Sequence, residues 1–250
     1  KDLFLSLAGT YGGIPGKNLE FQGPGVAHLP IPTRQVVATM GAEIGAEFVL
    51  FPPDDRALEY VRARVPAGET LRPVEADPEA HYEQEWPLAL DPLVPLVAEP
   101  GRVTRNVKPV QELSHVAIQR AVVGSCANGT LEDLEQVITI LAGRKVHSDV
   151  VLTVTPNTSA VFAEASRLGH LETIVRAGGL VTNATCGACF GGHLGVLGDG
   201  EVCVTSTTRN FQGRMGSSQA RIYLASSATV AASAVTGHLT DPRELLSEAP

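Results

Sequence analysis

Three cysteines lie in glycine-rich turns, and cysteine thiolates are the ligands that hold iron–sulfur clusters and many zinc ions in proteins. Cys126 is part of the run Gly-Ser-Cys-Ala-Asn-Gly at 124–129, and Cys186 and Cys189 form a C-x-x-C pair sixty residues later. One remote cysteine plus such a pair is typical of a cubane iron–sulfur cluster. Because a fully coordinated cluster uses four cysteines, three thiolates leave one iron open to a small ligand.

Two other kinds of site are compatible with this spacing. A zinc ion prefers four ligands, and His193, four residues after Cys189, offers a fourth. A C-x-x-C pair also occurs in thiol redox proteins. The pattern around His193 itself favours a structural histidine, with a supporting role behind the cysteines as the alternative. The fourth cysteine, Cys203, lies within Glu-Val-Cys-Val at 201–204, where we predict a small buried hydrophobe in a strand.

Strands and helices alternate around these turns. From apolar runs and periodicity we predict strands at 121–123, 150–154, 180–181 and 201–204, and helices at 131–142 and 160–177. Thr130 and Asp133 predict a capping box at the start of the first of these helices. The alternation indicates a parallel sheet with right-handed crossovers. The loops carrying Cys126 and the C-x-x-C pair then emerge at one edge of the sheet, where α/β proteins bind ligands.

The first half of the chain has weaker patterns. We predict helices at 2–7, at 33–40 and from Asp54 or Asp55 to Val61, and strands at 19–21 and 48–51. Thr33 is the predicted cap of the second helix. The continuous apolar run at 48–51 indicates a buried parallel strand. Residues 65–99 are rich in proline and acidic residues and predict surface loops, with one short strand at 88–90.

The composition is that of a globular protein and excludes several classes of function. Of 250 residues, 44% are hydrophobic and 18% are charged, with a net charge of −8 and no basic block. A nucleic-acid surface needs clustered Lys and Arg. No apolar run reaches the roughly 18–20 residues of a membrane span. All four cysteines follow position 120 and no secretory leader is visible, so we expect a cytoplasmic protein rather than a disulfide framework.

The chain resembles the aconitase superfamily in several motifs that occur in the same order. These are Met-Gly-Ala-Glu-Ile-Gly-Ala at 40–46 followed by Phe51-Pro52, the run at 124–129, Thr-Cys-Gly-Ala-Cys at 185–189 and Arg-Asn-Phe-Gln-Gly-Arg at 209–214. They are most similar to motifs in the large subunits of 3-isopropylmalate dehydratase and homoaconitase. The resemblance covers nearly the whole chain.

The resemblance implies an α/β fold of two aconitase-type domains, each with three α/β/α layers around a largely parallel sheet. We expect the second domain of a large subunit at 1–110 and the cluster-binding third domain at 111–250, with a boundary between 102 and 118. Two partners are also implied. One is an N-terminal domain preceding this chain that supplies further active-site His and Asp residues, and the other is a small swivelling domain or subunit that supplies a catalytic serine.

The activity implied by the resemblance is that of a hydro-lyase in amino-acid biosynthesis. Such an enzyme dehydrates and rehydrates a hydroxy di- or tricarboxylate, for example 3-isopropylmalate in leucine biosynthesis. Cys126, Cys186 and Cys189 would hold a 4Fe-4S cluster whose open iron acts as a Lewis acid on the substrate.

Five further residues receive roles only through the resemblance. Glu43 is implied to bond the substrate hydroxyl or a bound water, whereas its pattern alone favours a carboxylate that pairs with a neighbour. Arg209 and Arg214 are implied to bind substrate carboxylates, which guanidinium groups suit, whereas composition alone favours surface salt bridges. Thr39 and Thr208 occupy substrate-binding positions where the family usually has Asn. Threonine has a shorter reach and no amide.

The two threonines keep other functions open. Homoaconitase, aconitase or an isomerase of a modified malate are the alternatives among enzymes. A catalytically silent paralogue that keeps the fold is the alternative of another class.

Overall fold

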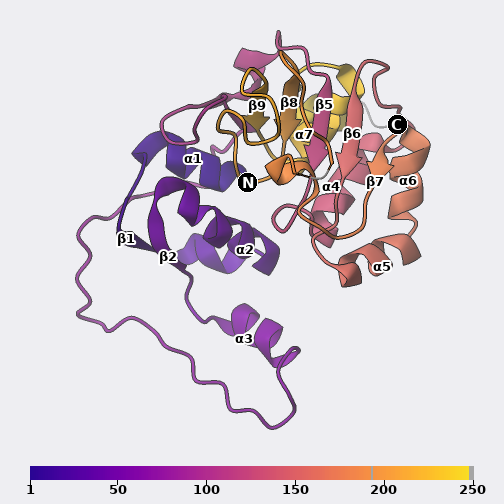
Figure 1. The fold of residues 1–250 in the computed structure, drawn as a ribbon. Helices are drawn as coiled ribbons and strands as arrows, with labels where there is room; N and C mark the ends of the chain where they lie inside the picture. Colours follow the sequence, from indigo (N-terminus) through magenta and orange to yellow (C-terminus); the bar gives the residue numbers. More distant parts are fainter. Residues whose placement is uncertain (193, 248–250) are drawn as a thin grey trace.

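The computed structural model describes residues 1–192 and 194–247, which form two β-sheets with helices packed around them (Figure 1). The strands are β1 (Lys17–Glu20), β2 (Ala46–Leu50), β3 (Leu96–Ala98), β4 (Val107–Pro109), β5 (Arg120–Val123), β6 (Val151–Val154), β7 (Leu180–Val181), β8 (Val202–Thr205) and β9 (Arg221–Leu224). The α-helices are α1 (Asp2–Tyr11), α2 (Ile31–Met40), α3 (Asp55–Arg62), α4 (Leu131–Leu141), α5 (Ser159–Arg167), α6 (His170–Ala177), α7 (Ser227–Thr236) and α8 (Pro242–Ser247). The 3-10 helices are η1 (Pro24–His28), η2 (Gly41–Ile44), η3 (Val110–Leu113) and η4 (Gly187–Phe190).

The larger sheet is mostly parallel, as predicted. Its strand order is β4-β3-β9-β8-β5-β6-β7, and each pairing from β9 to β7 is parallel. The strands β3 and β4 add an antiparallel edge. From β5 the chain moves outward through β6 to β7, whereas from β8 it moves the opposite way to β9. The order therefore reverses between β5 and β8, and α/β sheets bind ligands beyond the carboxyl ends of strands at such a reversal.

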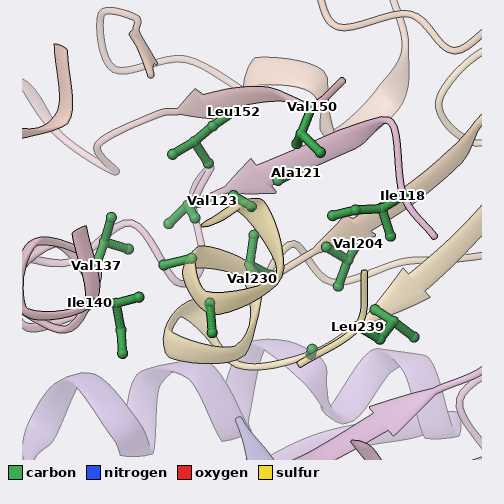
Figure 2. Packing of buried hydrophobic residues seen from close by; sticks show 14 of the residues in the cluster. Ile118, Ala121, Val123, Val137, Ile140, Val150, Leu152, Val204, Val230 and Leu239 are labelled. Atoms are coloured by element: carbon green, nitrogen blue, oxygen red, sulfur yellow. The ribbon is translucent and has the colours of Figure 1, made fainter. Parts of the chain in front are cut away.

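The main hydrophobic core covers one face of this sheet. Figure 2 shows Val123 and Leu152, from β5 and β6, packed toward Val137 and Ile140 of α4 and Val230 of α7. Together with α6, these two helices form the layer on that face. Strand residues alternate between the two faces, so a second set of side chains points to the opposite face. Residues such as Ala188, Leu197 and Met215 pack there, as does α1.

The strands β1 and β2 form a separate two-stranded parallel sheet in the first half of the chain. The strand at 48–51 was predicted to be buried, and this prediction is wrong for two of its side chains: Phe48 is 64% exposed and Leu50 51% exposed. Because strand side chains alternate between the two faces, Phe48 and Leu50 lie on one face of this small sheet, and that face is exposed whereas Val49 on the other is partly buried. An apolar run therefore does not here mean a strand buried on both faces. The next two strands along the chain, β3 and β4, pair with the larger sheet and not with β1 or β2.

Local signals decided several helix ends. The helix α3 begins at Asp55, one of the two predicted starts, and Asp54 caps it by accepting a hydrogen bond from Ala57 N at 3.0 Å. Thr33 does not cap α2, which begins two residues earlier at Ile31. The helix predicted at 160–177 is two helices, because Gly169 adopts a left-handed φ of 77° between α5 and α6. The strand predicted at 88–90 is absent from the described residues.

The segment 63–95 has no regular helix or strand and runs around the outside of the first half (Figure 1). Its side chains are mostly exposed, in agreement with the predicted surface loops. Tyr11 holds its second part by stacking on Trp86, with ring centroids 4.7 Å apart, and by donating a hydrogen bond to Pro87 O.

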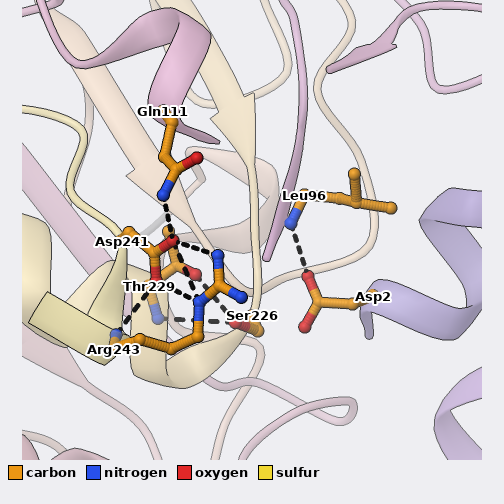
Figure 3. Close-up of polar contacts among 7 residues, drawn as sticks. All are labelled: Asp2, Leu96, Gln111, Ser226, Thr229, Asp241 and Arg243. Atoms are coloured by element: carbon orange, nitrogen blue, oxygen red, sulfur yellow. Dashed lines mark hydrogen bonds and ion pairs between the residues drawn. The ribbon is translucent and has the colours of Figure 1, made fainter. Parts of the chain in front are cut away.

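A buried carboxylate, that of Asp241, joins the start of α8 to η3 (Figure 3). The Asp241 side chain, only 1% exposed, accepts hydrogen bonds from Gln111 Nε2 at 3.2 Å and from the Arg243 guanidinium at 2.6 Å. Burial acts to raise the pKa of Asp241, but the hydrogen bonds from Arg243 and Gln111 outweigh it and lower the pKa below its usual value. The ionised carboxylate is therefore the form that stabilises the folded protein.

Replacing Asp241 by Ala is expected to lower the free energy of unfolding by about 1–3 kcal/mol at pH 7, because the hydrogen bonds that Gln111 and Arg243 donate to a charged carboxylate are lost. Since the folded pKa is lowered, this contribution is present at neutral pH and is lost as the pH falls through that pKa. Urea unfolding of both proteins at pH 7 and pH 3 measures it. The exposed pair of Glu164 with Arg167 supplies the control, and Glu164→Ala should leave the urea midpoint nearly unchanged because water screens this pair.

Candidate functional site

Loops that follow four neighbouring parallel strands meet at one edge of the larger sheet. Cys126 follows β5, Asn157 follows β6, and Cys186 and Cys189 follow β7. Arg209 follows β8, which lies on the other side of β5. The predicted placement of both cysteine loops at the carboxyl edge is confirmed, and the β5 and β8 loops flank the point where strand order reverses.

The loop carrying Cys126 lies directly against the backbone that follows β6. Gly124 has a φ of +79°, and a Cβ there would lie 2.1 Å from Thr155 O. A Cβ at Gly129 would lie 2.5 Å from the same oxygen, and Gly129 O accepts a hydrogen bond from Asn157 N at 2.8 Å. The two glycines of the motif are therefore required for two backbones to approach each other. They leave the Cys126 side chain exposed at the edge.

Asp133 fixes the other side of the Cys126 loop. The predicted capping box is present: Thr130 Oγ1 accepts from Asp133 N, and the Asp133 carboxylate accepts from Thr130 N. The same buried carboxylate accepts from Asn128 Nδ2 at 3.2 Å and from Ser227 Oγ of α7 at 2.7 Å. Asn128 itself has a left-handed φ of 54°, which asparagine tolerates better than most residues. The carboxylate thus joins the loop, α4 and α7.

The C-x-x-C pair lies in the turn that leads into η4. Gly187 N donates to Thr185 Oγ1 at 2.9 Å, and Cys189 is buried whereas Cys186 is exposed. Arg214 holds Cys189 by donating from Nε to its main-chain oxygen at 2.7 Å, and its Nη2 lies 3.7 Å from the Cys189 sulfur. One of the two predicted carboxylate-binding arginines is therefore attached to the C-x-x-C turn.

Glu43 and Arg209 meet across the two halves of the chain. Glu43 lies in η2, and its Oε1 accepts a hydrogen bond from Arg209 Nε at 2.7 Å. The side chains are 15% and 41% exposed, respectively. The hydrogen bond and the charge of Glu43 raise the pKa of Arg209, and the nearby thiols of Cys189 and Cys126 act in the same direction. The structure thus places Glu43, Arg209 and both of these cysteines near one another.

The two threonines lie beside this pair in different surroundings. Thr208, directly before Arg209, is buried, and Thr39, next to the end of α2, is exposed. Their contact with any substrate stays a prediction. His193 lies outside the described residues.

The thiols differ in a way that separates Cys203 from the other three. All four cysteines are free, and burial in β8 raises the pKa of Cys203 far above its usual value, which keeps that thiol protonated. Metal ligation needs the thiolate. Within residues 1–192 and 194–247, no group of three or more His, Cys, Asp or Glu side chains is placed to hold a single metal ion. A cluster holds each thiolate on a different iron and so needs wider spacing. Cys126, Cys186 and Cys189 are free thiols on loops at this edge, and their ligation of a cluster stays a prediction.

Sequence analysis did not predict the buried polar groups in and next to the Cys126 loop. Asn128 Oδ1 and Asn157 Oδ1 are buried without a hydrogen-bond partner among the described residues. Lys1 was not predicted either, although its Nζ donates to Met40 and Thr207, close to Glu43 and Arg209. The capping-box spacing was the only available signal for Asp133, and it gave no indication of the contacts with Asn128 and Ser227.

Comparison with known proteins decides the family. The sequence model of the aconitase family (aconitate hydratase) matches residues 1–111 and 101–237. The chain belongs to the aconitase family. As an aconitase-family chain, it is 49% identical over 249 residues to a 3-isopropylmalate dehydratase large subunit of Mycolicibacterium smegmatis, covering 99% of this chain and 58% of that protein. A large subunit 1 of the same enzyme from Methanopyrus kandleri is 43% identical over 248 residues, covering 98% and 59%.

This aconitase-family chain therefore spans less than three fifths of the length of these relatives. Among the helices in the described part of the chain, none is both long and apolar enough to cross a membrane.

Replacing Gly124 by Ala tests how tightly the Cys126 loop is held. The change adds backbone strain and a clash with Thr155 O, so the free energy of unfolding should fall by roughly 2–5 kcal/mol. Gly143 has a similar φ of +71°, and a methyl group added there would have nothing within 4 Å, so Gly143→Ala should cost only about 1–2 kcal/mol. Thermal unfolding of both variants measures the difference. Equal losses would show that the contact with Thr155 is unimportant.

Proposed function

We propose that this chain is the cluster-binding part of the large subunit of a hydro-lyase. Its substrate would be a hydroxy di- or tricarboxylate such as 3-isopropylmalate. The observation that carries the proposal is that Glu43, Arg209 and Arg214 meet the cysteine loops at one edge of a parallel sheet. Arg209 contacts Glu43, and Arg214 contacts Cys189. The names of the relatives support the choice of substrate.

The residues proposed to hold a 4Fe-4S cluster are Cys126, Cys186 and Cys189. When bound, such a cluster supplies a Lewis-acidic iron that makes a hydroxyl a better leaving group. The chain's part is to present three thiolates from loops that the glycine contacts and Asp133 hold in place. Arg214 adds a positive charge next to the Cys189 sulfur, with its Nη2 3.7 Å away.

The remaining residues would orient the substrate. Glu43 would accept a hydrogen bond from the substrate hydroxyl or from water, because its second carboxylate oxygen is not used by Arg209. Arg209 would bind a carboxylate with the donors that do not contact Glu43, and its exposed fraction leaves that side accessible. Arg214 would bind a second carboxylate in the same way. Thr208 and Thr39 would contribute hydroxyl groups at the rim of the site.

The proposal also includes partners outside this chain. The base that abstracts the proton is assigned to an N-terminal domain or to a small swivelling subunit. The relatives are large subunits, and this chain matches less than three fifths of their length. The domains proposed at 1–110 and 111–250 would together form one wall of a site that those partners close. We infer no contact with nucleic acid or membrane.

A second candidate is a catalytically silent paralogue, favoured by Thr39 and Thr208 in place of asparagines. Homocitrate and citrate are the alternative substrates if the protein is active.

Anaerobic reconstitution with iron and sulfide tests the cluster. The wild-type protein is expected to gain the broad visible absorption of an iron–sulfur cluster, with iron and sulfide bound in equal amounts. Replacing Cys126, Cys186 or Cys189 by Ala should abolish or greatly reduce the absorption. Cys203→Ala is the matched control and should leave it intact, since that thiol is buried in β8. A wild-type protein that remains colourless would contradict the proposal.

Turnover of 3-isopropylmalate, homocitrate and citrate by the reconstituted protein with its small subunit tests the reaction. We expect activity with 3-isopropylmalate, and a decrease in kcat of roughly tenfold or more for Glu43→Gln, because a neutral amide accepts a weaker hydrogen bond than a carboxylate does. Arg209→Lys should mainly raise KM, because Lys cannot pair with a carboxylate through two parallel bonds. A protein that binds a cluster but has no activity on any of the three acids would favour the silent paralogue.

A further inference from the structure

One ammonium group contacts both of the segments that carry the Glu43–Arg209 pair. Lys1 Nζ donates a hydrogen bond to Thr207 O at 2.6 Å and to Met40 Sδ at 3.1 Å. Met40 ends α2 and lies three residues before Glu43, and Thr207 lies two residues before Arg209. The lysine therefore joins the two backbones next to the place where the two side chains meet.

The Glu43–Arg209 contact is too weak to fix these segments by itself. Its partners are 166 residues apart, and the guanidinium side chain is 41% exposed. Water and salt screen an ion pair of this kind, and the two long side chains lose rotamer freedom when they pair. Another contact has to keep Glu43 opposite Arg209, and the hydrogen bonds of Lys1 to Met40 and Thr207 are such a contact.

The two groups that accept hydrogen bonds from Lys1 belong to buried residues, although Lys1 itself is partly exposed. Met40 and Thr207 are both fully buried. Burial lowers the pKa of Lys1 to about 7, although the charges of Asp133, Asp2, Cys189 and Glu43 act in the opposite direction. Donors and acceptors removed from water form stronger bonds than exposed ones and cost more when one partner is lost.

The start of α1 is itself fixed to the larger sheet, so Lys1 has a rigid base. Asp2 Oδ1 accepts a hydrogen bond from Leu96 N of β3 at 2.8 Å (Figure 3). The helix continues with the buried side chains Leu3, Phe4 and Leu5. Because its helix is fixed to the sheet, Lys1 can hold Met40 and Thr207 in fixed positions relative to that sheet.

We propose that Lys1 is a positioning residue of the site: its ammonium group clamps Met40 to Thr207 and thereby holds Glu43 opposite Arg209. The structural part stands on the contacts above, whereas the kinetic part rests on the proposed function. The lysine is not assigned a contact with substrate or with the reacting atoms.

Hydrogen exchange of the purified protein tests the structural part without any activity. In Lys1→Met, which keeps the length of the side chain but removes the donor, amides at 41–45 and 205–210 should exchange about tenfold faster, because local opening becomes easier. Amides of α4 should keep their wild-type rates. Lys145→Met is the matched control: Lys145 Nζ also donates to a main-chain oxygen, that of Arg176, but far from the site. It should change neither segment.

Two results would overturn the clamp. One is unchanged exchange at 41–45 and 205–210 in Lys1→Met, and the other is a uniform increase over the whole chain, which would indicate a general loss of stability. Lys1→Gln keeps a neutral donor and provides a second variant if Lys1→Met does not fold. It is expected to show the same local pattern with a smaller increase.

A double-mutant cycle tests the kinetic part. Lys1→Met should lower kcat/KM about tenfold in the wild-type background, but less than about twofold in Glu43→Gln, because both changes act through the same pair. Additive effects would show that Lys1 acts independently of Glu43 and would overturn the proposal. A wild-type protein without turnover contradicts the proposed function, whereas the exchange experiment still decides whether Lys1 is the clamp.

Discussion

The close approach of two backbones at the carboxyl edge of the larger sheet is the constraint on which the site depends. The strands β5 and β6 are held in register by their ladder, and the contact continues past both strands: Thr155 N donates to Val123 O, and Asn157 N donates to Gly129 O. Only residues without a Cβ fit opposite Thr155 O at 124 and 129. The Cys126 loop is therefore shaped by main-chain contacts, which are less sensitive to side-chain substitution than a packed side-chain cluster.

The sequence predicted the second half of the fold well because its signals are local and strong. Alternating apolar strands and periodic helices, a capping box at Thr130 and the glycine directly after β5 all indicate the same parallel arrangement. The first half was harder. A run such as 48–51 has the composition of a buried strand, but its exposure is decided by which segments pack on the two faces of its sheet, which is a long-range property. The break between α5 and α6 was likewise hidden, since one left-handed glycine is enough to end a helix whose apolar period continues.

The candidate site shows the same division. Residue types that do chemistry were found from motifs, and the edge on which both cysteine loops emerge followed from strand order. The groups that hold those residues could not be found in this way. The four bonds accepted by the Asp133 side chain, the unpaired amide oxygens of Asn128 and Asn157, and the bridge made by Lys1 depend on which segments meet in space. Spacing along the chain carries no information about a contact between residues 1 and 207.

The exposed segment 63–95 has a consequence for the integrity of the molecule. It departs from α3 and returns at β3, and the parts on either side of it are interlocked by the packing of α1 on β3 and β4. A protease that cut within 63–80, where side chains are almost all exposed, would produce two fragments that stay associated, because no buried contact depends on the peptide bond. The same geometry makes this stretch a suitable place for insertions, since lengthening an already long loop changes its closure entropy only slightly. Acidic side chains outnumber basic ones in this segment, so an inserted sequence would be flanked by negatively charged chain.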